Sequence, residues 1–152
     1  MEVMENQFLS VKNVLSYLTR VDSKSLGSLI EHIHRNSDVL DLKIIGKVMF
    51  LVKATHSIPD DTAMDIEMLV PVDKAFDSTS RYIYKPEFRL ENAVSVRHYG
   101  SYSGLLGTQK KLSDYIITKG LKAITDTCYV VDRNLLNDNV VSLYVGINGN
   151  IL

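Results

Sequence analysis

The two halves of this chain carry the same order of predicted elements, and this repetition limits the possible folds more than any other feature. Each half gives a strand, a helix and then two strands. Short segments of the halves align at similar distances, because Ser95 follows Ser16 by 79 residues and Ser142 follows Glu67 by 75. A recurring supersecondary unit is typical of a duplicated fold. We therefore predict an α+β protein with a duplicated β-α-β-β repeat.

The apolar periodicity predicts two helices. Four apolar residues between positions 26 and 33 recur at the spacing of one helical face, which predicts a helix over Ser23–Asn36. Asp22 or Ser23 is the expected N-cap of this helix. A second helix is predicted over Leu105–Lys119, and Gly120 is expected to end it. The predicted strands are Val11–Val21, Ile44–Thr55, Met64–Val72, Ala93–His98, Thr127–Asp132 and Val140–Ile147.

The length of 152 residues fits one domain that contains both repeats. We predict a single domain over residues 1–152. Repeat one covers about residues 11–73 and repeat two about residues 91–148. The polar stretch over about residues 74–90 is expected to be a connection between them.

Composition argues against several classes of function. Seventeen Lys and Arg against 18 Asp and Glu give a net charge of −1, so the chain lacks the overall positive field that draws proteins to nucleic acid. The acidic N-terminus does not resemble a secretory signal, and the apolar run Val48–Val52 is too short to span a membrane. We therefore expect a cytoplasmic protein that binds neither membranes nor nucleic acid directly. Cys128 lies in an apolar strand and is expected to be a buried, unreactive thiol.

Candidate site residues lie on the predicted strands and on the turn before the second helix. Glu67 stands within an apolar strand, either as a pocket acid or as a cross-strand partner of a Lys or Arg. Tyr144 shares a strand face with Ser142, and its ring either forms a cleft wall or packs in the core. Strand alternation places Glu67, Ser142 and Tyr144 on the side of the sheet opposite the helices. The same alternation directs Met68, Val70, Leu143 and Val145 towards the core.

Further candidate residues are histidines of both halves and tyrosines of the second half. His98 stands at a strand end, where a hydrogen-bonded structural role is expected ahead of a base or a haem ligand. Tyr99 and Tyr102 flank a glycine, and one of them is expected to be structural. His32 and His34 are two residues apart on a predicted helix, so they point about 200° apart and do not share a metal. We expect no metal and no cofactor.

The stretch VRHYGSYSGL resembles the GyrI-like effector-binding domain family, part of the superfamily that includes SOUL-type proteins and the effector domains of bacterial transcription activators. Arg97, His98, Gly100 and Tyr102 match the Arg-His-x-Gly-x-Tyr hallmark of that family. The strand MDIEMLVPV matches a second hallmark, an acidic residue in an apolar strand that ends in Val-Pro-Val. The resemblance covers roughly residues 11–148.

This resemblance implies a bacterial protein whose two repeats are related by pseudo-twofold symmetry, with an antiparallel curved sheet and two helices packed on one face. It also implies a cleft between the repeats that binds aromatic or cationic small molecules. Aromatic walls and a buried glutamate would hold the ligand, because a cation neutralises a carboxylate that is costly to bury alone. The glutamate most important to the family falls at Ser142 in this chain. Some family members are hydrolases, and the loss of that acid makes catalysis a less expected role here.

The leading hypothesis is therefore a stand-alone domain that binds a small organic molecule, such as a cationic aromatic compound, or a protein partner in its inter-repeat cleft. The predicted ligand-binding residues are Glu67, Ser142, Tyr144, Tyr99, Tyr102 and His98. An interaction or accessory module of a bacterial operon, whose cleft has degenerated, is the first alternative. A small hydrolase of the same fold is the second. The sequence does not determine the oligomeric state.

Overall fold

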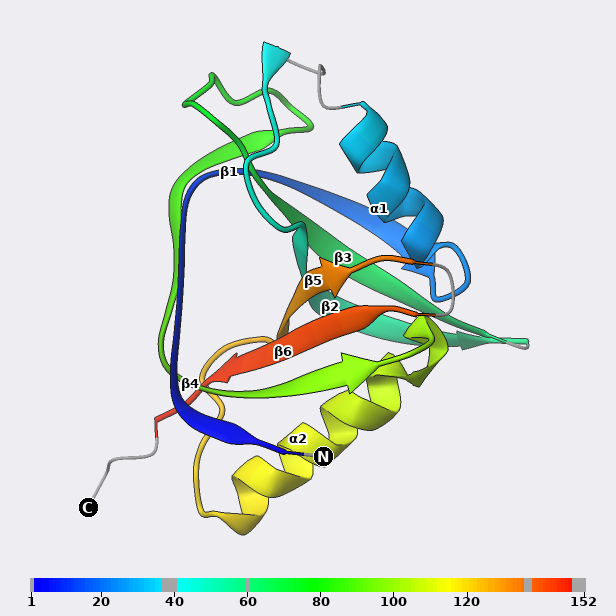
Figure 1. The fold of residues 1–152 in the computed structure, drawn as a ribbon, viewed down its shortest axis with the longest axis vertical. Helices are drawn as coiled ribbons and strands as arrows, with labels where there is room; N and C mark the ends of the chain where they lie inside the picture. Colours follow the sequence, from blue (N-terminus) through cyan, green and yellow to red (C-terminus); the bar gives the residue numbers. More distant parts are fainter. Residues whose placement is uncertain (1, 37–40, 60, 136–137, 149–152) are drawn as a thin grey trace.

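A computed structural model of the chain describes residues 2–36, 41–59, 61–135 and 138–148. Its element order repeats as the sequence predicts: strand, helix, strand, strand, twice over. A short 3-10 turn at Tyr102–Gly104 precedes the second helix. The elements are β1 (Met4–Asp22), α1 (Leu26–Arg35), β2 (Met49–Ile58), β3 (Asp61–Pro71), β4 (Ile83–Tyr99), α2 (Leu105–Thr118), β5 (Cys128–Arg133) and β6 (Val140–Gly146) (Figure 1).

The six strands form a closed antiparallel barrel in the order β1-β3-β2-β5-β6-β4. In each repeat the last two strands form a hairpin, and the two repeats meet where β2 pairs with β5 over three residue pairs. The long strands β1 and β4 close the barrel on its other side. In Figure 1 this paired stretch runs down the left of the molecule, away from α1. The structure therefore confirms the α+β class, and the antiparallel sheet, which was predicted only to be curved, closes into a barrel.

The closure comes from two segments that the sequence analysis left outside the strands. Residues 4–10 extend β1 towards the N-terminus, and β4 begins at Ile83, inside the predicted connection. Leu9 pairs with Leu90 and Val11 with Phe88, so apolar side chains of both segments join the barrel interior. Only alternate side chains of a strand face the interior. Most of the remaining residues here are polar, and Met4, Phe8 and Ile83 are exposed apolar residues, so the alternating strand pattern is hidden.

The pairing registers of the two repeats agree residue by residue. Ser16 pairs with Leu69 in repeat one, and their counterparts Ser95 and Tyr144 pair in repeat two. Glu67 pairs with Leu51, and the counterparts Ser142 and Val130 also pair. The two helices begin at Leu26 and Leu105, which are also 79 residues apart. Both long strands also carry a left-handed asparagine at equivalent positions, Asn13 with φ 57° and Asn92 with φ 50°.

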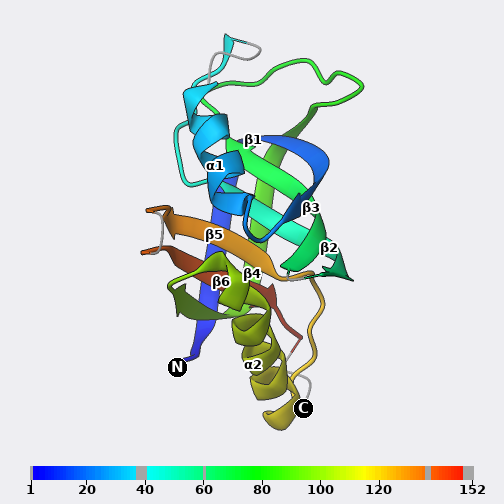
Figure 2. The same ribbon diagram turned by 90° about the vertical axis from the view of Figure 1, so that its right-hand side faces the viewer.

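Both helices contribute to one apolar cluster with alternate residues of the strands. Leu26 and Ile30 of α1 and Leu112 of α2 are almost fully buried in it. The rings of Phe50 and Tyr129 stack at 4.8 Å in the same cluster, at the junction of β2 and β5. The strand residues of this cluster include Met68, Leu143 and Val145, as alternation predicts. Figure 2 shows α1 and α2 beside the two halves of the barrel.

Several element ends differ from the sequence prediction. The helix α1 begins at Leu26 with Ser25 as its N-cap, three residues later than predicted. Asp22 instead accepts a hydrogen bond from the Ser25 amide at 2.8 Å, and the Ser23 hydroxyl donates to Asp61. The strand β2 begins at Met49 rather than Ile44, because Ile44 makes only an isolated bridge to Val72.

A second apolar cluster fills the barrel on the face away from the helices. It joins central strand residues of both repeats with side chains of the long strands. Its buried members are Val14, Met49, Leu51, Leu69, Leu90, Ala93, Cys128 and Val130, with Leu9, Val11, Phe88 and Tyr144 packed against them. Apolar side chains thus occupy the middle of the face on which the cleft was predicted.

Candidate functional site

Glu67 lies on β3, in a ring of hydrogen-bonding and cationic groups. The Ser16 hydroxyl on β1 donates to its Oε2 at 2.6 Å, and Lys85 on β4 donates to the same oxygen. Lys53 on β2 holds its ammonium 3.6 Å from Oε1. The Glu67 side chain is only 11% exposed, so these contacts replace most of its hydration.

These contacts lower the pKa of Glu67. Burial alone would raise the pKa, but the hydrogen bonds from Lys85 and Ser16 and the charges of Lys85 and Lys53 outweigh that cost. Glu67 is therefore a paired carboxylate and not an unpaired pocket acid. A lone buried carboxylate is costly, and Lys85 reaches it from the segment predicted to be a connection. The cross-strand ion pair that the sequence also allowed is the arrangement found.

Ser142 occupies the position equivalent to Glu67, and a carboxylate still lies beside it. The Ser142 hydroxyl donates to Oδ2 of Asp132 on β5. Lys47 pairs with the other Asp132 oxygen at 2.7 Å. Asp132 stands at a bulge of β5, and its side chain is 16% exposed. Asp132 was not predicted as a site residue from the sequence. The only indication was a charged residue directly after the apolar strand CYVV.

Tyr144 lies next to this group on the same strand face as Ser142. Burial, followed by the nearby charge of Asp132, raises the pKa of Tyr144, while Lys47 and Arg97 act in the opposite direction. Its side chain packs against the barrel cluster while also lining a surface hollow. Tyr144 thus combines the two roles that the sequence left open, a core contact and a wall.

His98 uses both ring nitrogens within the protein. Nε2 lies 2.8 Å from the Ser101 carbonyl oxygen, which only accepts, so Nε2 carries the proton. Nδ1 lies 2.7 Å from the Thr108 hydroxyl. The ring is so close to Gly104 that a Cβ there would lie 2.9 Å from His98 Cε1. These contacts tie the end of β4 to the start of α2.

Tyr102 and Tyr99 differ sharply in burial. Tyr102 is 7% exposed, and its hydroxyl donates to Asn134 at 2.7 Å. Burial raises the pKa of this hydroxyl. Tyr99 is 66% exposed at the end of β4. Of this pair, Tyr102 is the structural member.

The structure brings four of the six predicted site residues to one hollow. We call it the Ser142 hollow; it has a volume of about 740 Å³ and is lined by Ser142, Tyr144, His98, Tyr99, Arg97, Ser95, Val96, Thr108, Lys111, Met4 and Glu2. Glu67 lines a separate hollow with Lys85 and Ser16, and Tyr102 lines a third beside α1. Leu51 and Cys128 stand between Glu67 and Tyr144 in one row across the barrel. The row spans three strand spacings, about 14 Å.

The charges around the Ser142 hollow are mainly positive. Arg97 and Lys111 line it, and neither has an acidic partner within the described part of the chain. Glu2 is the one acid among the lining residues that the structure describes, and it is exposed. Asp132 is neutralised by Lys47. The lining thus presents two tyrosine rings, three hydroxyl side chains of Ser and Thr, two cations and one exposed acid.

The structure also bears on a metal site, on a reactive cysteine and on a membrane-spanning helix. Within residues 2–36, 41–59, 61–135 and 138–148, no group of three or more His, Cys, Asp and Glu residues is arranged to hold a metal ion. Cys128 is fully buried, as predicted, and burial raises the pKa of its thiol to about 12. A thiol with such a pKa stays protonated and is a poor nucleophile at neutral pH. No helix in the described ranges is long and apolar enough to cross a bilayer.

Comparison with solved structures identifies the fold. The crystal structure of the EcmrR C-terminal domain superposes with a TM-score of 0.69 at 15% identity, over 97% of this chain and 99% of that domain. This chain has the fold of the EcmrR C-terminal domain. The fold that the GyrI-like resemblance implied is thereby confirmed.

Two further structures extend the comparison. The EcmrR chain in a cryo-EM structure of an EcmrR–DNA complex gives a TM-score of 0.68 at 14% identity, and this chain spans 57% of its length. An uncharacterised conserved protein from Listeria innocua gives a TM-score of 0.52 at 11% identity, over 93% of this chain and 91% of that one. No family model and no curated protein matches this sequence.

Proposed function

We propose that this chain binds a small planar organic molecule, and that the binding site is the Ser142 hollow rather than a cleft centred on Glu67. The observation that carries the proposal is the convergence of Ser142, Tyr144 and Tyr99 with the unpaired Arg97 in one hollow. Its volume of about 740 Å³ lies in the range typical of small-molecule sites. The fold shared with the EcmrR C-terminal domain, and the resemblance to effector-binding domains, agree with this role.

The side chains of the hollow divide the work of binding. The exposed ring of Tyr99 and the half-buried ring of Tyr144 offer aromatic faces to a planar ligand. Ser142 holds its hydroxyl between Asp132 and the hollow, so it accepts a hydrogen bond from a ligand while donating to Asp132. Arg97 supplies a planar group of donors suited to a carboxylate or a carbonyl.

The charge distribution favours a neutral or anionic ligand over a cation. The cationic preference implied by the family resemblance depends on an unpaired glutamate. In this chain Glu67 is paired with Lys85 and Lys53, and the equivalent position is Ser142. Arg97 and Lys111 repel a cation and attract an anion. The proposed ligand is therefore a planar aromatic molecule with a carboxylate or another polar, uncharged group.

A matched set of ligands tests this proposal. Naphthoate, naphthamide and naphthylmethylammonium share one ring system and differ in charge. We expect naphthoate and naphthamide to raise the melting temperature by mass action, and the ammonium compound to raise it least. Arg97→Gln should weaken naphthoate by about tenfold, since a charge-assisted hydrogen bond is lost. Arg89→Gln, an exposed arginine elsewhere on β4, is the matched control and should bind naphthoate as the wild type does.

Two outcomes would overturn the proposal. If naphthoate and naphthamide leave the melting temperature unchanged, the Ser142 hollow does not bind planar ligands, and an interaction module becomes the better account. If both bind but Arg97→Gln retains full affinity for naphthoate, the ligand occupies a different site.

A further inference from the structure

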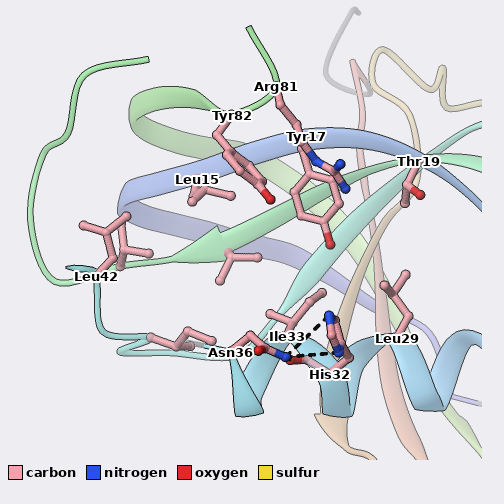
Figure 3. Close-up of a pocket in the computed structure, with 13 residues that line it drawn as sticks. Leu15, Tyr17, Thr19, Leu29, His32, Ile33, Asn36, Leu42, Arg81 and Tyr82 are labelled. Atoms are coloured by element: carbon pink, nitrogen blue, oxygen red, sulfur yellow. Dashed lines mark hydrogen bonds between the residues drawn. The ribbon is translucent and has the colours of Figure 1, made fainter. Parts of the chain in front are cut away.

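A second cavity lies between α1 and the barrel, outside the Ser142 hollow. We call it the α1 pocket; its volume is about 160 Å³. Figure 3 shows Leu29, His32, Ile33 and Asn36 on its helix side, with Leu15, Tyr17 and Thr19 of β1 facing them. Val70 and Val72 complete the sheet side, and Leu42, Ile44, Arg81 and Tyr82 close the remaining walls.

Repeat two also has a hollow beside its helix, of about 480 Å³, which is lined by Val145, Leu121 and Ala123, the counterparts of Val70, Leu42 and Ile44. Tyr17 corresponds to Val96, Val70 to Val145 and Ile33 to Leu112 in the register of the two repeats. These second-repeat residues are at most 3% exposed and belong to the main core cluster together with Ile116. In repeat one, Leu15 and Val70 form a small separate cluster instead. The repeats therefore differ in the walls of this opening: repeat two packs Val96 and Leu112 into its core where the α1 pocket is lined by Tyr17 and Ile33.

The pocket combines an aliphatic interior with two aromatic rings. Tyr17 and Tyr82 meet edge to face, with ring centroids 5.6 Å apart. The Arg81 guanidinium lies 5.8 Å from the Tyr17 ring centroid and 5.5 Å from that of Tyr82. Neither tyrosine hydroxyl has a hydrogen-bond partner in the described ranges, so both hydroxyls can bond to a ligand.

The polar groups of this pocket carry no negative charge. The lining residues that the structure describes include Arg81 and His32 but no Asp or Glu. Arg81 has no carboxylate partner among the described residues. A guanidinium held against two rings keeps its in-plane donors available, and those donors match a carboxylate in pairs. The electrostatics therefore favour an anionic group at the Arg81 end.

We propose that the α1 pocket binds one small aromatic carboxylate, whose ring lies among the aliphatic side chains of α1 and the sheet and whose carboxylate meets Arg81. The size supports a single ring, because an apolar cavity of roughly 150 Å³ accommodates benzene. The two-ring ligands of the Ser142 hollow are too large for it. This site is independent of the proposed function and would remain if that proposal failed.

Benzoate, benzyl alcohol and benzylammonium are the probes for this site, used with the full chain in isothermal calorimetry. We expect benzoate to bind most tightly and benzylammonium least. Arg81→Gln should weaken benzoate by about tenfold and leave benzyl alcohol nearly unchanged, because only the charge-assisted contact is lost. Arg81 is exposed, so this variant should fold as the wild type does. Arg89→Gln, an exposed arginine that lines neither the α1 pocket nor the Ser142 hollow, is the matched control and should bind benzoate as the wild type does.

The assignment fails on either of two results. If benzoate binds no better than benzylammonium, the charge argument is wrong. If Arg97→Gln weakens benzoate while Arg81→Gln does not, the small ring occupies the Ser142 hollow. In that case the proposed function stands and the α1 pocket is not a site.

Discussion

Repeat one and repeat two share a pairing register but place their polar and apolar groups differently. In repeat one the centre of the third strand carries Glu67, neutralised by Lys85 and Lys53. In repeat two the equivalent residue is Ser142, and the carboxylate is Asp132 on the neighbouring strand. On the helix side, repeat one lines the α1 pocket with Tyr17 and Ile33, where repeat two packs the equivalent Val96 and Leu112 into the main core cluster. Equivalent backbone positions therefore do not fix which face of a repeat offers a site.

Beside the β2–β5 junction two Lys–Asp ion pairs join the repeats, and each lysine of repeat one has an aspartate as its counterpart in repeat two. Lys53 pairs with Asp126 at 2.8 Å, and Lys47 pairs with Asp132 at 2.7 Å. In the shared register Asp132 is the counterpart of Lys53 and Asp126 that of Lys47. Lys53 and Asp132 both occupy a β-bulge. The pseudo-symmetric arrangement survives although the sign of each charge has changed.

The largest expected effect concerns packing on the helix side. Leu112→Ala in repeat two should lower the free energy of unfolding by about 3 kcal/mol, because it empties a fully buried position. The counterpart Ile33→Ala in repeat one should cost only about 1 kcal/mol, since Ile33 already borders the α1 pocket. Urea unfolding measures both values. Equal losses would show that the α1 side is as tightly packed as the α2 side.

An intermediate effect is expected at Glu67. Glu67→Gln should lower the free energy of unfolding by about 2 kcal/mol at neutral pH, because Lys85 loses its charged acceptor. The matched variant Ser142→Ala in repeat two should cost less, since Asp132 keeps Lys47 as its partner. Urea unfolding at neutral pH compares them. A larger loss for Ser142→Ala would reverse the ranking of the two polar groups.

The pH dependence of the Glu67 effect follows from its lowered pKa. A carboxyl with a lower pKa in the folded state contributes stability above the unfolded value, about 4.3, and loses it as the pH falls through the folded value. The difference in unfolding free energy between wild type and Glu67→Gln should therefore shrink below about pH 4. This comparison cancels the contribution of Asp65, whose pKa Arg20 and His56 also lower. A difference that grows on acidification would mean that the pKa of Glu67 is raised.

The smallest effects are expected at the reversed ion pairs. Lys47→Met and Lys53→Met should each change the free energy of unfolding by about 0.5 kcal/mol, because both lysines are largely solvated. A double-mutant cycle of Lys47 with Asp132 should give a larger coupling than one of Lys53 with Asp126, because Asp132 is more buried than Asp126. The couplings should fall as salt is added. Equal, salt-independent couplings would contradict this ranking.

Local patterns in the sequence predicted the helices and the register of the repeats. Helical spacing located α1 and α2, and the offsets of Ser95 from Ser16 and of Ser142 from Glu67 match the pairing of the strands. Barrel closure was missed because β1 pairs with β4 across 67 to 91 residues of chain. Such long-range pairing has no local signature.

The candidate site was predicted only in part, for the same reason. Ser142, Tyr144 and Tyr99 were identified from strand position and resemblance, and the structure places them at one hollow. The partners of Glu67 were not identified, because Lys53 and Lys85 reach it from two other strands. Asp132 was missed because a β-bulge, which the sequence does not reveal, turns it towards Ser142. Side-chain pairing across strands decides which acids remain available to a ligand.

The most direct test of ligand binding in repeat two is a ¹H–¹⁵N NMR titration of the full chain with naphthamide. An uncharged probe follows the location of the site without a bias from charge. We expect the largest amide shifts at Arg97, Tyr99 and Ser142, with little change at Ser16 and Glu67. The largest shifts at Ser16, Glu67 and Lys85 would contradict the account and return the binding site to the glutamate of repeat one.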